Sequence, residues 1–128
     1  SDYVDIADHY RATSNDAGHS PRVGFPTYLH VARTSQEARS RWRPHLDHYV
    51  DFATGVRGSF GRPTDFDSLI TGPAICGSPA EVVERIEDVN DTLGLGRQLF
   101  LLDIGALPTD ALRDCIELMG SEVLPLLG

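Results

Sequence analysis

Two patterns of apolar residues follow one another in the second half of the chain. Residues 79–93 carry an apolar side chain at every third or fourth position, which is typical of one face of an amphipathic helix. Ser78, Pro79 and Glu81 supply an N-cap, a favoured first helical residue and a capping-box glutamate. Residues 99–102 form an unbroken apolar run, which is typical of a strand covered on both faces in a parallel sheet. A final helix follows, with its expected apolar stripe at Leu112, Ile116, Met119 and Val123.

The first half of the chain predicts two helices with a strand between them. Residues 2–17 have a short apolar stripe and precede Gly18, the usual type of residue after a helix end. Residues 23–32 are rich in β-forming side chains, and Pro26 favours a bulge or an irregular start of that strand. A second capping box at 34–37 indicates where the second helix begins.

The segment between the second and third helices has a different composition. Residues 53–73 are rich in Gly, Pro, Asp and Ser and predict a long loop with at most one short helix. A loop of this length in a compact domain tends to be functional or mobile. Residues 73–76 predict a short strand. The expected order is therefore helix, strand, helix, loop, short strand, helix, strand, helix, which indicates an α/β protein with a parallel sheet.

Three parallel strands of this kind fit two architectures. With helices on one side, they make a wedge of a (β/α)8 barrel, and they can also make a small open α/β sheet. A wedge exposes two sheet edges and an apolar inner face, which are unfavourable without a partner. We therefore expect the chain to form homo-oligomers through its exposed edges.

Composition narrows the possible partners and surroundings. The chain has 128 residues, enough for one domain or part of one, and its formal net charge is -8. This acidity disfavours nucleic acid and anionic membranes as partners. No apolar run approaches the length of a membrane span. Two cysteines do not make a disulfide framework, so a cytoplasmic protein with free thiols is expected.

Four segments together form a recognisable pattern: HVARTSQEAR at 30–39, GSPAEVVERI at 77–86, DIGALP at 103–108 and EVLP at 122–125. In this order and spacing, they resemble the C-terminal portion of the bacterial luciferase-like flavin monooxygenases. The resemblance extends over nearly the whole chain.

The resemblance implies a fold and an activity. Members of the family are (β/α)8 TIM barrels that bind FMN, or a deazaflavin coenzyme in some branches, and oxidise small organic molecules, often with molecular oxygen. Residues 1–128 would be a single incomplete domain, the last three β/α units of such a barrel. The absent units supply most flavin contacts in the family, so the isolated chain is expected to be inactive and to bind no cofactor by itself.

The expected strand ends contain two candidate pocket residues, because a (β/α)8 barrel has its active site at the carboxyl ends of its strands. His30 is a candidate for contact with flavin or substrate, and its alternative is a buried strand histidine bonded to backbone. Asp103 is a candidate for orienting the substrate, and its alternative is an aspartate that stabilises the turn. No residue of the chain is assigned a catalytic role.

Three further features have a possible role in binding and a structural alternative. Arg57 lies in a glycine- and arginine-containing segment at 55–62, which would close over an anionic substrate or be a surface loop. The helix start at 77–78 could bind an anion, but Ser78 already has a capping role. Histidines and aspartates at 45–51 are expected on a solvated helix face, with no metal bound.

Two other functions remain open from the sequence. The protein could be a relative that holds flavin or another ligand without turnover. It could also be a stand-alone, self-associating α/β protein.

Overall fold

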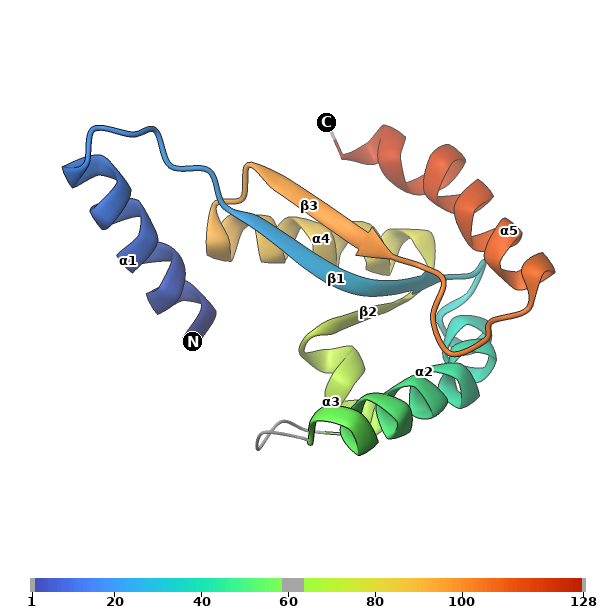
Figure 1. Ribbon diagram of the computed structural model, residues 1–128. Coiled ribbons are helices and arrows are strands. Elements are labelled where there is room, and N and C mark those ends of the chain that lie inside the picture. Colours follow the sequence, from blue (N-terminus) through green and yellow to red (C-terminus); the bar gives the residue numbers. More distant parts are fainter. Residues whose placement is uncertain (1, 59–63, 128) are drawn as a thin grey trace.

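In the computed structural model, residues 2–58 and 64–127 form a three-stranded parallel sheet with helices packed around it (Figure 1). The expected elements are present, in the expected order. Their bounds are α1 (Asp2–Asp16), β1 (Gly24–Val31), α2 (Ser35–Arg57), α3 (Phe66–Thr71), β2 (Ala74–Gly77), α4 (Pro79–Leu93), β3 (Arg97–Leu101) and α5 (Thr109–Leu118), followed by a π-helical turn (Met119–Val123) and a 3-10 turn (Leu124–Leu126).

The sheet has the order β2-β1-β3, so β1 is its central strand. Both neighbours run parallel to β1, which confirms the expected parallel α/β fold. They pair with different halves of it, β3 with the first half and β2 with the second, and Tyr28 is the one residue opposite both. Pro26 lies opposite Leu99 in an uninterrupted register, so the bulge expected there is wrong.

This strand order places helices on both faces of the sheet. The chain leaves β1 for one edge, where β2 lies, and then crosses β1 to reach β3 on the other edge. Right-handed crossovers in opposite directions put α2 and α3 on one face and α4 on the other. The expectation of helices on one side only is therefore wrong, because it assumed strands that neighbour one another in chain order.

Each face of the sheet has its own apolar core, because alternate side chains of a strand point to opposite faces. On one face, Trp42 and Leu46 of α2 and Phe66 of α3 pack against Ala74 and Cys76 of β2. The residues of the other core come from β1, β2, α4, α5 and the π-helical turn, and are Leu29, Val31, Ile75, Val82, Ile86, Cys115, Leu118, Met119 and Val123.

Part of the apolar surface lies outside these cores. Leu99 and Leu101 are adjacent members of one face of β3 and remain 53% and 45% exposed. The expectation of a strand covered on both faces is therefore wrong for β3, which lies at an edge of the sheet. An apolar groove of about 640 Å3 lies between the α1 stripe and the first half of β1. The exposed surface expected of a barrel wedge is therefore present, while self-association through it stays a prediction.

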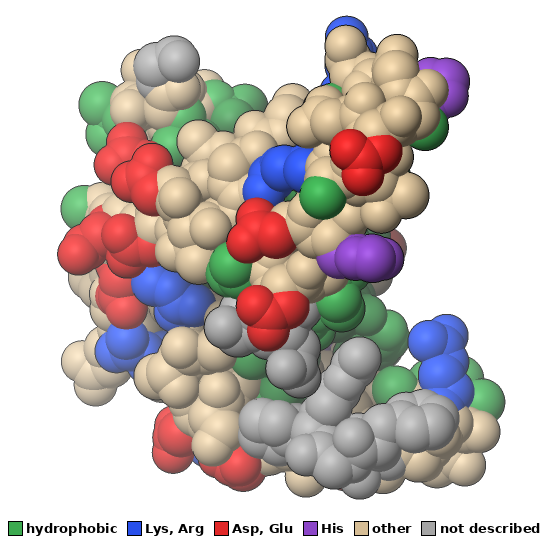
Figure 2. All heavy atoms as spheres, turned by 90° about the vertical axis from the view of Figure 1, so that its left-hand side faces the viewer, with side chains coloured by type: hydrophobic (Ala, Val, Ile, Leu, Met, Phe, Trp, Pro, Cys, Tyr) green, Lys and Arg blue, Asp and Glu red, His purple; other side chains and the backbone are tan. Residues whose placement is uncertain are grey.

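Helix α1 is attached to the carboxyl end of α4. Arg11 donates hydrogen bonds to the carbonyl oxygens of Leu93 and Gly94, the latter at 2.9 Å. This places a cation at the carboxyl end of α4, where the helix dipole favours positive charge. Figure 2 shows this side of the molecule, on which acidic and basic side chains lie among one another. Within the described residues, no helix combines the length and the apolarity that a membrane crossing requires.

Arg41 of α2 ties three elements together around the buried His30. Its Nε donates to His30 Nε2 at 2.9 Å and its Nη2 donates to the carbonyl oxygen of Val31 at 3.0 Å, both in β1. Its Nη1 forms an ion pair with Asp114 of α5 at 2.9 Å. The His30 ring also stacks on Trp42, with the centroids 5.7 Å apart. Burial, followed by the nearby Arg41 charge, lowers the pKa of His30 from 6.5 to about 4.

This low pKa predicts a loss of stability in mild acid. Below pH 6.5, His30 becomes protonated in the unfolded chain, whereas in the folded chain it becomes protonated only near pH 4. The free energy of unfolding should therefore be highest above pH 6.5 and fall towards pH 4, with His30 contributing on the order of 3 kcal/mol. Urea unfolding at several pH values measures this fall.

The variant His30→Phe keeps a ring against Trp42 but has no group that titrates at this position. Its free energy of unfolding should therefore decrease much less between pH 6.5 and pH 4. The exposed His48 provides a matched control, and His48→Gln should keep the pH dependence of the unsubstituted chain. If the free energy of unfolding depends on pH in the same way in His30→Phe and in the unsubstituted chain, His30 is not the cause of the decrease.

Candidate functional site

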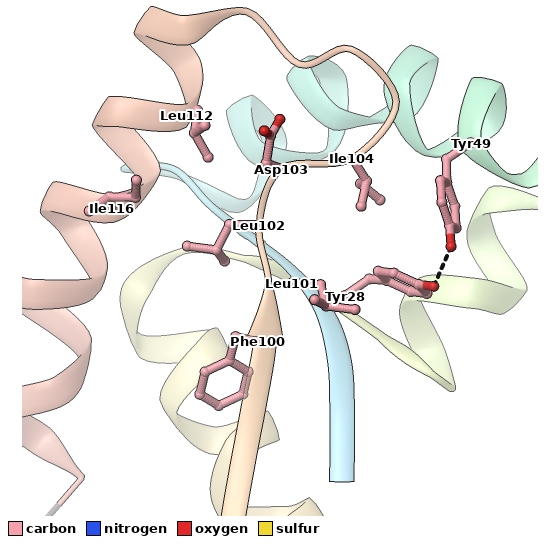
Figure 3. A pocket seen from close by; sticks show the side chains of 9 residues that line it. All are labelled: Tyr28, Tyr49, Phe100, Leu101, Leu102, Asp103, Ile104, Leu112 and Ile116. Carbon is pink, nitrogen blue, oxygen red and sulfur yellow. Dashed lines mark hydrogen bonds between the residues drawn. The ribbon is translucent and has the colours of Figure 1, made fainter.

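A pocket of about 470 Å3 lies where β3 ends (Figure 3). The chain leaving the strand forms its floor, α5 forms one wall, and β1 and α2 form the opposite wall. The carboxyl ends of parallel strands are the usual location of ligand sites in α/β proteins. The lining residues are Tyr28, Tyr49, Phe100, Leu101, Leu102, Asp103, Ile104, Leu112 and Ile116.

The loop after β3 is held in place by a close approach to α2. His45 Nδ1 and the carbonyl oxygen of Gly105 are 2.9 Å apart and share a hydrogen bond. Gly105 has φ +63° and packs so closely that a Cβ would overlap the carbonyl oxygen of His45. Only glycine satisfies both conditions. Next to it, Ala106 has φ +57°, so the turn consists of two residues in left-handed conformation.

Helix α5 turns its larger apolar residues towards the pocket. Its most buried positions are Ala111, Cys115 and Leu118. Leu112 and Ile116, which were expected to be on the buried stripe, line the pocket instead, and Ile116 is 52% exposed. The smaller Ala111 and Cys115 are each buried in one of the two cores, so the wall of the pocket consists of branched aliphatic side chains.

A tyrosine pair provides polar groups on the opposite wall. The hydroxyl oxygens of Tyr28 and Tyr49 are 2.5 Å apart, and the ring centroids are 5.0 Å apart. Burial and the hydrogen bond between the two hydroxyls raise the pKa of Tyr28 to about 12. Tyr28 lies in the strand expected at 23–32 and Tyr49 in the second helix, and neither was a candidate for binding. The available signal was a hydroxyl-bearing ring two positions before His30, on the same face of the strand.

Asp103 is exposed and lines the pocket, and in Figure 3 its carboxylate points away from the tyrosine pair. Among the described residues, no hydrogen bond to its side chain is present, so the turn-stabilising alternative has no contact to support it. The carboxylate is therefore available at the rim of the pocket. Whether it orients a substrate stays a prediction.

His30 and Arg57 lie outside the lining of the pocket. His30 is fully buried between Arg41 and Trp42, and its Nδ1 has no hydrogen-bond partner among the described residues. Arg57 is the last residue of α2, and its charge acts against the rise in the pKa of Tyr28, which indicates that it lies near the tyrosine pair. The loop expected from residue 53 is wrong as far as Arg57, because α2 continues to that point. Residues 59–62 of the expected binding segment lie outside the described residues.

The helix start at 77–78 is filled by the protein's own side chains. Ser78 Oγ accepts a hydrogen bond from the Glu81 backbone N–H, and Ser35 Oγ accepts one from the Ser78 N–H at 3.2 Å. The Glu81 carboxylate accepts from Ser35 Oγ and pairs with Arg39 at 2.7 Å. A phosphate at this position would lose these donors and face a carboxylate. The capping interpretation of Ser78 is therefore confirmed.

The thiols offer no reactive group near the pocket. Cys76 and Cys115 are buried and unpaired, and burial raises the pKa of both, that of Cys76 to about 12. A thiol that stays protonated is a poor nucleophile and a poor metal ligand. In residues 2–58 and 64–127, no group of three or more His, Cys, Asp or Glu side chains is arranged to hold a metal ion.

The close approach of the loop to α2 predicts the effect of one substitution. Gly105→Ala should destabilise the protein by about 2–4 kcal/mol, because it adds both a clash and a left-handed alanine. Ala106→Gly is the matched control in the same turn and should change stability by less than about 1 kcal/mol. Urea unfolding compares the two variants. Equal stabilities would show that the turn does not depend on this contact.

Comparisons with known proteins give one sequence relative and several structural ones. No family model matches the chain. It is 31% identical over 103 residues to limonene 1,2-monooxygenase of Rhodococcus erythropolis, a match that covers 76% of this chain and 26% of that protein. The chain therefore spans about a quarter of the length of this curated relative.

The structural neighbours agree in fold and also extend well beyond the chain. Monooxygenase RslO1 from Streptomyces bottropensis has a TM-score of 0.81 at 22% identity, covering 98% of this chain and 38% of its own. The oxygenating constituent of 3,6-diketocamphane monooxygenase from Pseudomonas putida, a type II Baeyer-Villiger monooxygenase in complex with FMN, has a TM-score of 0.68 at 20% identity, covering 96% and 39%. The coenzyme F420 dependent tetrahydromethanopterin reductase from Methanopyrus kandleri has a TM-score of 0.70 at 18% identity, covering 99% and 42%.

Proposed function

The chain belongs to the bacterial luciferase-like monooxygenase family, and from this premise we propose that it forms one wall of the substrate pocket of a flavin-dependent monooxygenase. The pocket in Figure 3 is the observation that carries the proposal. It lies at the carboxyl end of β3, where barrel enzymes bind their substrates. Its aliphatic walls suit a small, largely apolar organic molecule.

The pocket residues have a limited set of tasks in this proposal. Leu102, Ile104, Leu112 and Ile116 exclude water and hold the apolar body of the substrate. Asp103 lies at the rim and orients the part of the substrate nearest to it. His30 acts at a distance, because it accepts the hydrogen bond from Arg41 that fixes α2 against β1.

The start of α4 does not fit the phosphate of a flavin. The N-terminus of α4, the helix end beside the sheet, is occupied by Ser35, Ser78 and the carboxylate of Glu81. We therefore propose that the cofactor, FMN or a deazaflavin as its alternative, is held by segments of the barrel outside this chain. Two structural neighbours have FMN or coenzyme F420 in their names, which supports this class of cofactor.

The exposed apolar surfaces of the chain also support a longer barrel, in which other segments supply the rest of the site. The relatives are more than twice as long as the part that this chain matches. The exposed face of β3 at Leu99 and Leu101, and the groove along the first half of β1, would be covered by neighbouring barrel strands. We propose that the isolated 128-residue chain does not turn over substrate, because it supplies only one part of the site.

A chimera tests this function. In it, the chain replaces the matching segment of the Rhodococcus erythropolis relative, which supplies the rest of the barrel. Supplied with reduced FMN and oxygen, the chimera should oxygenate at least one member of a panel of terpenes and cyclic ketones. Leu112→Trp, which fills the pocket, should lower this rate at least about tenfold without changing the flavin affinity.

Leu126→Trp is the control, since Leu126 is 62% exposed and outside the pocket. Gas chromatography of the products measures the rate, and flavin fluorescence measures cofactor binding. A flavin-loaded chimera that yields no oxygenated product, or a Leu112→Trp variant as active as its parent, would contradict the proposal.

A further inference from the structure

The tyrosine pair differs in kind from the rest of the pocket. Among the described lining residues, the polar side chains are Tyr28, Tyr49 and Asp103, and all others are hydrocarbon. The two hydroxyls lie together on the wall opposite α5 (Figure 3). A pocket of this composition fixes the orientation of a ligand through its few polar groups.

The pair has a proton that no group accepts in the part of the chain that the structure describes. Each phenol has one proton to donate and two lone pairs. In the 2.5 Å contact one hydroxyl donates to the other, so the accepting hydroxyl keeps its own proton. Within the described residues, neither hydroxyl has a second hydrogen-bond partner. Both residues are half-buried, so leaving this donor unpaired under a bound ligand is unfavourable.

The Tyr28 hydroxyl is neutral under ordinary conditions. Burial, and then the hydrogen bond between the two hydroxyls, raise the pKa of Tyr28 to about 12, while the Arg57 charge acts in the opposite direction. The Tyr28 hydroxyl therefore remains protonated in neutral solution. A hydroxyl that accepts a hydrogen bond is polarised by it, and this strengthens the hydrogen bond that the same hydroxyl donates.

We propose that the Tyr28–Tyr49 hydroxyl pair donates a hydrogen bond to an uncharged acceptor oxygen of the substrate, such as a carbonyl oxygen. This inference rests on the proposed function, because it takes the pocket of Figure 3 to be the substrate site. The aliphatic walls hold the hydrocarbon part of the molecule, and the carboxylate of Asp103 at the rim disfavours an anionic group. The tyrosines thus act as positioning residues that select for one oxygen and set its place in the pocket.

A matched pair of probes isolates this hydrogen bond. Cyclohexanone carries the acceptor oxygen, and methylenecyclohexane has nearly the same shape with a CH2 group in its place. The two are hydrated differently, so the measured quantity is the ratio of their dissociation constants and how substitution changes it. Titrations of the chimera described above, in which the barrel is complete, followed by NMR shifts of the pocket methyl groups, give both constants.

Removal of either hydroxyl should weaken the preference for the ketone. Tyr28→Phe and Tyr49→Phe should each lower it by about 3- to 10-fold, the range of a typical hydrogen bond. The affinity for methylenecyclohexane should change little, because the rings and the walls are retained. Tyr10→Phe, on α1 and outside this pocket, is the matched control and should leave the ratio unchanged. Thermal unfolding of each variant checks that the fold is retained.

The two possible negative results of this experiment have different meanings. If both probes bind and the ratio is the same in the Tyr28→Phe and Tyr49→Phe variants, the pair does not hold the oxygen and the inference is overturned, while the pocket stands as a ligand site. If neither probe binds to the chimera with its native tyrosines, the pocket is no ligand site, and the proposed function fails together with the inference.

Discussion

The pocket depends on one guanidinium group. Arg41 lies on α2 and makes three contacts, with a ring nitrogen and a carbonyl oxygen of β1 and with the carboxylate of Asp114 on α5. A planar guanidinium with several fixed donors is suited to hold elements in one relative position. Asp114 lies two residues from both Leu112 and Ile116, and Tyr49 lies two turns along α2 from Arg41. The same contacts that join α2, β1 and α5 therefore set the distance between the two walls of the pocket.

The buried histidine is what allows Arg41 to make this connection. Arg41 Nε can donate only to an unprotonated Nε2, so His30 must be neutral and carry its proton on Nδ1. Full burial beneath the stacked Trp42 ring enforces that state by lowering the pKa of His30. A histidine at a strand end suggested contact with a ligand. In the structure, its observed contacts position the helices that carry the pocket residues.

Much of the fold could be predicted because its signals are local. The capping box at Ser78, the apolar run at 99–102 and the spacing of helical stripes each act over a few residues, and each predicts the type of element observed. The run at 99–102 did not predict the exposure of Leu99 and Leu101, because burial of a strand depends on its place in the sheet and β3 lies at an edge. Strand order could not be predicted in this way. β2 has four residues, and its place beside the second half of β1 depends on contacts with α2, α3 and α4, which no local period records.

The site was harder to predict than the fold, for the same reason. Asp103 could be found because its place directly after a strand has a general meaning in parallel sheets. Tyr28 and Tyr49 are 21 residues apart and belong to different elements, so their contact exists only after folding. On α5, the small residues Ala111 and Cys115 were overlooked as the packing face because the larger Leu112 and Ile116 form an equally regular stripe.

Hydrogen exchange of the backbone amides of α5 tests the central claim most directly. It should be compared in Arg41→Gln and in Arg43→Gln, a neighbouring exposed arginine whose ion pair with Asp67 is at the surface. If Arg41 joins the walls, α5 should exchange about tenfold faster or more in Arg41→Gln, since hydrogen bonds to charged groups are lost, and should be unaffected in Arg43→Gln. Unchanged protection of α5 in a folded Arg41→Gln variant would show that the walls are held by other contacts and would contradict the account.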